Sequence, residues 1–153
     1  MNKEKSIEVL NTLIEINNDR IAGYETASKE TEELDLKNLF SGLKQTSQKC
    51  KAELVSEVVK LGGTPIEGTK ATGKLFRIWM DIKSALTGKD RKTILNSCEF
   101  GEDMAVDTYQ EALRDNLLDI TAEQQTMLNE QLAKIKAGHN MVKNLRDSLV
   151  DAK

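Results

Sequence analysis

Between two long segments of helical periodicity lies the stretch GGTPIEGTKATGKLFRIWMDIKSALTGK, residues 62–89. It opens with Gly62, Gly63 and Pro65, residue types that commonly end a helix. Within it, residues 73–87 carry apolar side chains at helical spacing, so we expect a short amphipathic helix there. Such a helix and the looser residues around it span about 40 Å. The stretch therefore predicts a connection that runs from one end of a helical bundle to the other.

Four segments with a helical repeat of apolar residues flank this connection. The third is expected to begin at Asp90 and the second at Asp35, each as an N-cap, while Thr121 and Gln124 form a capping box for the fourth. The expected helices are 3–31, 35–61, 90–117 and 121–151.

Only a few residues join the first helix to the second and the third to the fourth, so each pair should be antiparallel. One long crossover between two antiparallel pairs is the ferritin-like topology. We therefore expect an all-α, ferritin-like antiparallel four-helix bundle in a single domain, residues 1–153.

The composition excludes several classes of protein. The 22 basic and 25 acidic side chains are mixed along the chain, with a net charge of −3. The absence of a basic stripe argues against nucleic acid or an anionic membrane as a partner. Its first residues are charged and no apolar run approaches membrane-spanning length, so we expect neither a signal region nor a membrane span. Its two cysteines make no disulfide framework. We expect a cytoplasmic protein.

Four motifs resemble a known family. They are AGYETASKE (22–30), KLGGTP (60–65), FRIWMDIKSALTGKD (76–90) and CEFGEDMAVDTYQEAL (98–113). Together they resemble a bacterial family of ferritin-like four-helix bundles that is known as domain of unknown function 2383, most strongly over residues 10–112. The resemblance implies the bundle fold and brings no established activity.

Several polar side chains fall among the apolar ones on helical wheels drawn at about 100° per residue. A charged group on an inner face costs several kcal/mol (about 3–5) unless it is paired. Counting residues from the helix ends places Glu102 level with His139 near mid-bundle, and Glu25 level with Arg146 nearer the first turn. We predict that these residues form two buried polar pairs.

A ferritin-like di-iron site takes a Glu from each of two helices and a Glu-x-x-His from each of the other two. Here Asn18, Ser47 and Lys136 stand where carboxylates are needed, while Glu102 and His139 remain. A lysine ammonium also opposes a divalent cation. We therefore expect no intact di-iron site.

A single-metal site is the alternative for the same residues. Its candidate ligands are Glu102 and His139, with Glu99 or Cys50, and iron or manganese would be the ion.

The predicted crossover helix has an apolar arc wider than one stripe. Leu75, Ile78, Trp79 and Met80 contribute to it. The arc either packs onto the first two helices or forms the interface of a homodimer, and both can hold together.

Catalytic motifs are missing from the sequence: it has no Gly-rich phosphate loop, no Ser-His-Asp set and no Cys-x-x-Cys. We therefore predict no catalytic residues and a non-enzymatic interaction or stress-related protein, the stress role being an analogy with the family. The alternative function is a divalent-metal (iron or manganese) binding protein with a degenerate site and weak oxidase activity.

Overall fold

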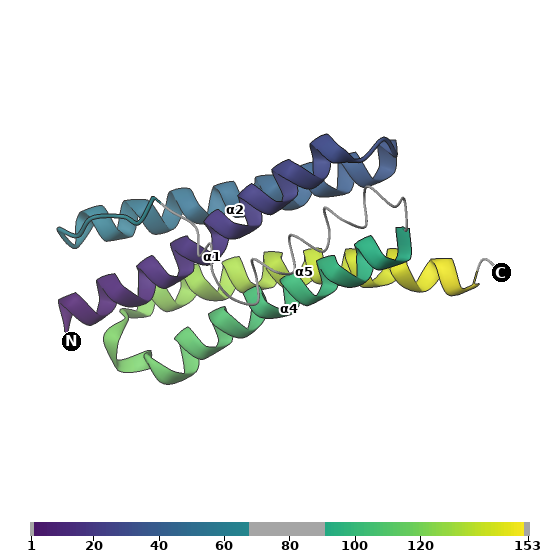
Figure 1. Cartoon of the computed structure of the whole chain (residues 1–153). Coiled ribbons are helices and arrows are strands. Elements are labelled where there is room, and N and C mark those ends of the chain that lie inside the picture. The colour runs from purple at the N-terminus through teal and green to yellow at the C-terminus, as the bar shows by residue number, and fades with distance from the viewer. Residues whose placement is uncertain (1, 68–90, 152–153) are drawn as a thin grey trace.

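The computed structural model describes residues 2–67 and 91–151 (Figure 1). The described helices are α1 (Lys3–Glu30), α2 (Leu34–Lys60), α4 (Arg91–Asp115) and α5 (Ala122–Asp151), with a short 3-10 helix, η1 (Leu117–Asp119), before α5. The crossover helix predicted at 73–87 lies outside the described residues. The fold is an all-α ferritin-like bundle, as predicted from the sequence.

Local side-chain chemistry sets several helix ends. Asn2 caps α1 by accepting a hydrogen bond from the Lys5 amide at 3.2 Å. At α5, Thr121 and Gln124 exchange hydrogen bonds of 3.0 and 2.9 Å, which is the predicted capping box. Gly62 follows α2 with φ of 81°, a conformation that favours glycine.

The predicted N-cap at Asp35 is wrong. The N-cap of α2 is Glu33, whose side chain makes no capping hydrogen bond. Asp35 lies in the first turn, where its carboxylate pairs with Arg91. The Asp35 carboxylate, which the sequence predicts to cap α2, therefore forms an ion pair with α4 instead.

The ends of α2 and α4 establish the crossover. Gly63 lies against the Ile7 side chain, at the start of α1. Arg91, at the start of α4, reaches Glu33 at 3.3 Å and also contacts Asp35, at the opposite end of α1. The end of α2 and the start of α4 therefore lie at opposite ends of the bundle (Figure 1).

The first residues after α2 run along α1 towards its C-terminal end. Asn11 donates to the Thr64 carbonyl at 3.1 Å and accepts from the Ile66 amide at 3.0 Å. About two turns further along, Asn18 donates to the Ile66 carbonyl at 3.4 Å. Side-chain amides on α1 thus supply the hydrogen bonds that the irregular backbone lacks.

The inner positions of α1, α2, α4 and α5 repeat in alternating steps of three and four residues. In α1 they are Leu10, Leu13, Asn17, Arg20, Tyr24 and Ala27, and in α4 Leu95, Cys98, Glu102, Ala105, Tyr109 and Ala112. In α2 they are Leu36, Phe40, Leu43, Ser47, Cys50 and Leu54, and in α5 Gln124, Leu128, Gln131, Ile135, Gly138 and Val142. This is the 3.5-residue repeat of helices that pack in a left-handed supercoil.

A layer of polar residues divides the core. One apolar cluster includes Leu10 and Leu128, and the other includes Phe40 and Val142. Between them lie buried polar side chains, namely Asn17, Arg20, Ser47, Glu102 and Gln131. We call these five residues the middle layer.

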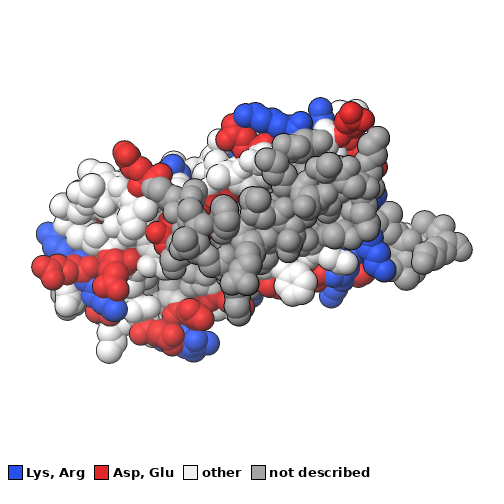
Figure 2. Space-filling model, in the orientation of Figure 1, with Lys and Arg blue, Asp and Glu red and all other residues white. Residues whose placement is uncertain are grey.

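The described surface carries both acidic and basic side chains, and the described helices include no candidate membrane span. On the face drawn in Figure 2, acidic and basic side chains lie beside one another. Among the described helices, none combines the length and the apolar character that crossing a membrane requires.

Candidate functional site

Glu102 has no exposed surface and lies at the centre of the middle layer. Arg20 Nη2 donates to both of its carboxylate oxygens, at 2.7 and 2.8 Å. Tyr24 donates its hydroxyl to Oε1 at 2.6 Å. Arg20 Nη1 donates to Ser47 Oγ at 2.6 Å, so α1, α2 and α4 meet around one carboxylate.

The pKa values of Arg20 and Tyr24 are both raised in this group. Burial is the largest single influence and lowers the pKa of Arg20, but Glu102, Tyr24 and Cys50 together raise the pKa above its ordinary value. Burial and the negative charge of Glu102 raise the pKa of Tyr24 well above its ordinary value. Arg20 therefore stays charged, and Tyr24 stays protonated as a hydrogen-bond donor to Glu102.

A second set of hydrogen bonds extends the middle layer towards the surface. Asn17 donates to the Tyr109 hydroxyl at 2.9 Å, and Tyr109 donates to Gln131 Oε1 at 2.7 Å. Gln131 Nε2 donates to Glu53, which is exposed, at 3.2 Å and to the Cys50 carbonyl at 3.4 Å. This second set joins α1, α4, α5 and α2.

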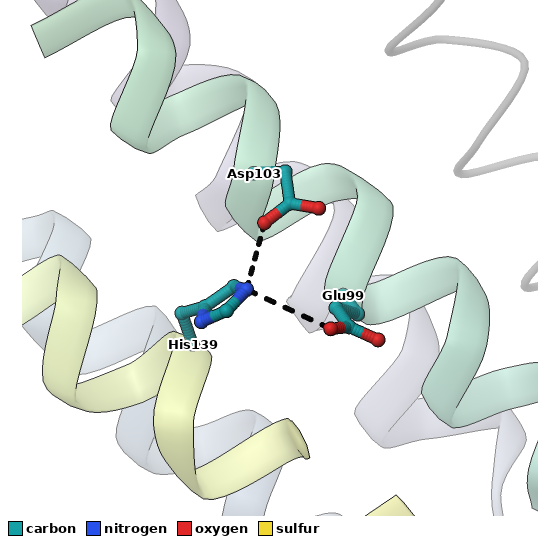
Figure 3. Close-up of side chains that lie close together, drawn as sticks. All are labelled: Glu99, Asp103 and His139. Atoms are coloured by element: carbon teal, nitrogen blue, oxygen red, sulfur yellow. Dashed lines mark ion pairs between the residues drawn. The ribbon is translucent and has the colours of Figure 1, made fainter. Parts of the chain in front are cut away.

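A triad of Glu99, Asp103 and His139 lies outside the core, between α4 and α5 (Figure 3). His139 Nε2 lies 2.7 Å from an Asp103 oxygen and 3.8 Å from Glu99 Oε1. Each member of the triad comes one residue after a buried inner position of its helix. These inner positions are Cys98, Glu102 and Gly138. The triad therefore occupies the flank along which α4 and α5 meet.

Burial and a neighbouring cation distinguish the members of the triad. The side chains of Glu99 and His139 are 18% and 21% exposed, whereas that of Asp103 is 52% exposed. Arg146 contacts the second oxygen of Glu99 and lies 3.1 Å from Asp147. One oxygen of Glu99 therefore faces His139 while the other is held by a guanidinium.

The structure does not form the predicted pair between Glu102 and His139. Glu102 is paired with Arg20, and His139 with Asp103. The physical reason is that Gly138, not His139, occupies the inner position of α5. A Cβ at Gly138 would lie 2.6 Å from Leu43 and 4.0 Å from Glu102 Oε1.

The predicted pair between Glu25 and Arg146 is also corrected. Glu25 lies 3.4 Å from Lys29 of its own helix, and its side chain is 47% exposed. Arg146 pairs with Glu99 across α4 and α5. Tyr24, the neighbour of Glu25, takes the inner position at this level of α1.

The structure brings together two of the four predicted metal ligands, Glu99 and His139, and adds Asp103. Glu102 is engaged by Arg20, and Cys50 lies in the core. Burial raises the pKa of the Cys50 thiol, which therefore stays protonated and is a poor ligand. The predicted interface residues Leu75, Ile78, Trp79 and Met80 lie outside the described residues.

A family model for a domain of unknown function, DUF2383, matches residues 5–115. The chain belongs to this family. The matched part of the DUF2383 chain includes Arg20, Ser47 and Glu102 and two members of the triad, Glu99 and Asp103. His139 and Arg146 lie beyond it. The resemblance drawn from the sequence motifs is thus confirmed.

One solved structure supports the ferritin-like fold of this DUF2383 protein. It is described as a crystal structure of ferritin-like, diiron-carboxylate proteins from Bacillus anthracis str. Ames. The match has a TM-score of 0.75 at 16% sequence identity, and it covers 95% of this chain and 99% of that one. Among curated proteins, none matches the chain.

Proposed function

We propose that this DUF2383 protein is a non-enzymatic ferritin-like bundle whose interior is closed by an arginine–glutamate pair in place of a di-iron centre. One observation carries the proposal. The Arg20 guanidinium lies within hydrogen-bond distance of both oxygens of Glu102, the one carboxylate of the middle layer.

The donor set of the middle layer does not fit two iron ions. Bundle di-iron sites use four carboxylates and two imidazoles. Here Glu102 is accompanied by Asn17, Ser47 and Gln131, which are neutral, and by a guanidinium. A second cation close to Arg20 would be repelled in a region of low dielectric constant. Glu102 already has its counter-charge, so an ion would have to displace a side chain that is itself fully buried.

The cellular role that we propose is that of a cytoplasmic interaction or stress-related protein. The mixed charge of the face in Figure 2 supports a surface that stays dissolved without attracting nucleic acid. We also propose a homodimer. Large apolar side chains of the described surface, including Leu34 at 73% and Met141 at 56% exposure, support association with another copy. Sedimentation analysis of the whole chain would give a single monomer species if this is wrong.

Iron loading tests the absence of a di-iron centre. The tag-free protein would be loaded with ferrous iron without oxygen, desalted and analysed for bound iron, and then followed for oxidation in air. We expect fewer than two irons per chain and no oxidation faster than that of free iron. Two irons per chain that are retained by Asp103→Asn and lost from Glu102→Gln would overturn the proposal. These two variants separate an interior site from the outer triad.

The second candidate function, divalent-metal binding, is favoured by the triad. It concerns a different place in the fold and a single ion, and it can hold whether or not the interior is free of iron.

A further inference from the structure

We propose that Glu99, Asp103 and His139 form a binding site for one divalent transition-metal ion on the flank between α4 and α5. The site would take an ion that accepts both nitrogen and oxygen ligands, such as Zn²⁺ or Mn²⁺. One imidazole and two carboxylates suit such ions better than Mg²⁺ or Ca²⁺, which prefer oxygen alone.

The spacing of the ligand atoms is close to what one ion requires. Ligands about 2.1 Å from a common ion, at tetrahedral or octahedral angles, lie about 3.0–3.4 Å from each other. His139 Nε2 is 2.7 Å from Asp103 and 3.8 Å from Glu99 Oε1. One ligand atom from each of the three residues lies within 4.8 Å of the other two. Small side-chain rotations would bring all three to the ion without moving a helix.

The backbone holds the three ligands in place. Glu99 and Asp103 are one turn apart on α4, so both side chains project towards the same flank of α5. His139 lies on α5 directly after Gly138, whose missing side chain lets α5 approach Leu43 of α2. The ligands are therefore carried by two packed helices and not by a loop.

Groups around the triad orient the ligand atoms towards one point. His139 Nδ1 faces Asn140 Oδ1 at 3.5 Å, while Nε2 faces the two carboxylates. Arg146 holds the Oε2 atom of Glu99 and leaves Oε1 facing His139. Metal-binding histidines and carboxylates are commonly supported in this way through the atom that does not bind the ion.

The exposure of the triad suits an ion with water in its remaining coordination positions. Glu99 and His139 are mostly covered, while Asp103 is 52% exposed on the solvent side. Three protein ligands and an open position are typical of zinc sites that are not purely structural. The competing explanation is an ordinary ion pair between the helices, with a proton on His139 in place of the metal ion.

The single histidine makes the test direct. The whole chain, freed of any polyhistidine tag, would be titrated with ZnCl₂ while the imidazole signals of His139 are followed by NMR. Calorimetry would give the affinity and the stoichiometry. We expect one Zn²⁺ per chain and a shift of the His139 signals that saturates at that ratio.

Substitutions locate the site. His139→Gln and Asp103→Asn should each weaken Zn²⁺ binding at least about 100-fold, since loss of a supporting group alone costs 10–100-fold. Asp107→Asn is the matched control, because Asp107 is exposed one turn further along α4 and carries the same charge. It should change the affinity less than twofold. Circular dichroism would verify that each variant is folded.

Two results would overturn the site. The first is a titration in which the His139 signals do not move. The second is an equal loss of affinity in Asp103→Asn and Asp107→Asn, which would show only a general attraction of cations to acidic surface. Glu102→Gln should still bind Zn²⁺, because Glu102 lies in the interior and is not part of the triad. This variant therefore distinguishes the flank site from an iron site in the interior.

Discussion

Glu102 and Asp103 are consecutive residues of α4 in opposite surroundings. Glu102 is fully buried and bound by Arg20 and Tyr24, whereas the Asp103 side chain is 52% exposed and meets His139. One step of about 100° around the helix separates a carboxylate of the core from one on the flank. Helix face, rather than residue type, decides which acid stabilises the fold and which is available to a ligand.

The largest expected effect tests this difference directly. Glu102→Ala should lower the free energy of unfolding by about 3–5 kcal/mol, because it leaves the buried Arg20 guanidinium without its partner. Asp103→Ala should lower it by less than about 1 kcal/mol, as is usual for an exposed ion pair. Urea unfolding of the two variants measures both values.

A double variant completes the comparison. Arg20→Met with Glu102→Leu removes both charges, and its loss should be much smaller than the sum of the single losses. Equal losses at positions 102 and 103, or strict additivity at 20 and 102, would contradict the buried pair.

The neighbouring hydrogen bonds of the core should give an intermediate effect. Tyr109→Phe removes the hydroxyl that donates to Gln131 Oε1, and leaves a buried acceptor without that donor. We expect a loss of about 1–3 kcal/mol by thermal or urea unfolding. Tyr24→Phe is a useful comparison, because Glu102 keeps its bonds to Arg20 and the loss should be smaller. No loss in Tyr109→Phe would show that this part of the layer is hydrated.

The ion pair at the α1–α2 turn should contribute a small term that depends on pH. The hydrogen bond from Arg91 lowers the pKa of Asp35, so the folded state binds the proton less readily than the unfolded state. The stabilisation is therefore present above the unfolded pKa of about 3.9 and is lost as the pH falls through the lower folded pKa. Asp35→Asn should be less stable than the parent by under about 1 kcal/mol at pH 6, and the difference should vanish once the pH lies below the folded pKa of Asp35. A difference that does not change with pH would rule out this pair as its cause.

The smallest effect is expected on the surface of α1. Among the described residues Glu25 pairs with Lys29 in the next turn, so Glu25→Ala should change the free energy of unfolding by no more than about 0.5 kcal/mol. Denaturant titration with Thr26→Ala as a neighbouring surface control would measure the change. A loss of several kcal/mol would restore the buried pair that the sequence suggested for Glu25.

Residues that end or begin helices made much of the fold predictable from the sequence. Gly62 and Pro65 mark the end of α2, and Thr121 with Gln124 marks the start of α5, because their backbone and capping preferences are local. The length of the connection between α2 and α4 then selects the ferritin-like topology over a simple up-down bundle. None of these inferences needs to know which side chains touch.

Which core residues can pair depends on the helical period. A helical wheel drawn at 100° per residue assigns the inner face of α1 incorrectly. At 100° per residue, Arg20 falls about 120° from Ile14 and appears to face outward. In the supercoiled bundle the inner positions follow a 3.5-residue repeat, which runs from Asn17 through Arg20 to Tyr24. Reading α1 with this repeat would have placed Arg20 on the inner face, among the possible partners of Glu102.

The sequence suggested that His139 faces inward because the residue before it is a glycine. Gly138 occupies the inner position of α5 but has no side chain to mark it as apolar, so the inward place appeared to belong to the next residue. The ion pairs of Glu99 and Arg146 on the flank depend on how α4 and α5 dock, which local sequence patterns do not encode. These are the parts of the candidate site that the chain alone could not supply.

The Arg20–Glu102 pair has a consequence for how the protein withstands its environment. A carboxylate that is neutralised by a metal ion ties folding to the supply of that ion, and chelators or metal starvation then weaken the protein. The counter-charge of Glu102 is instead part of the polypeptide and is synthesised with it. The charge of this one buried carboxylate is therefore neutralised without any supply of metal ions.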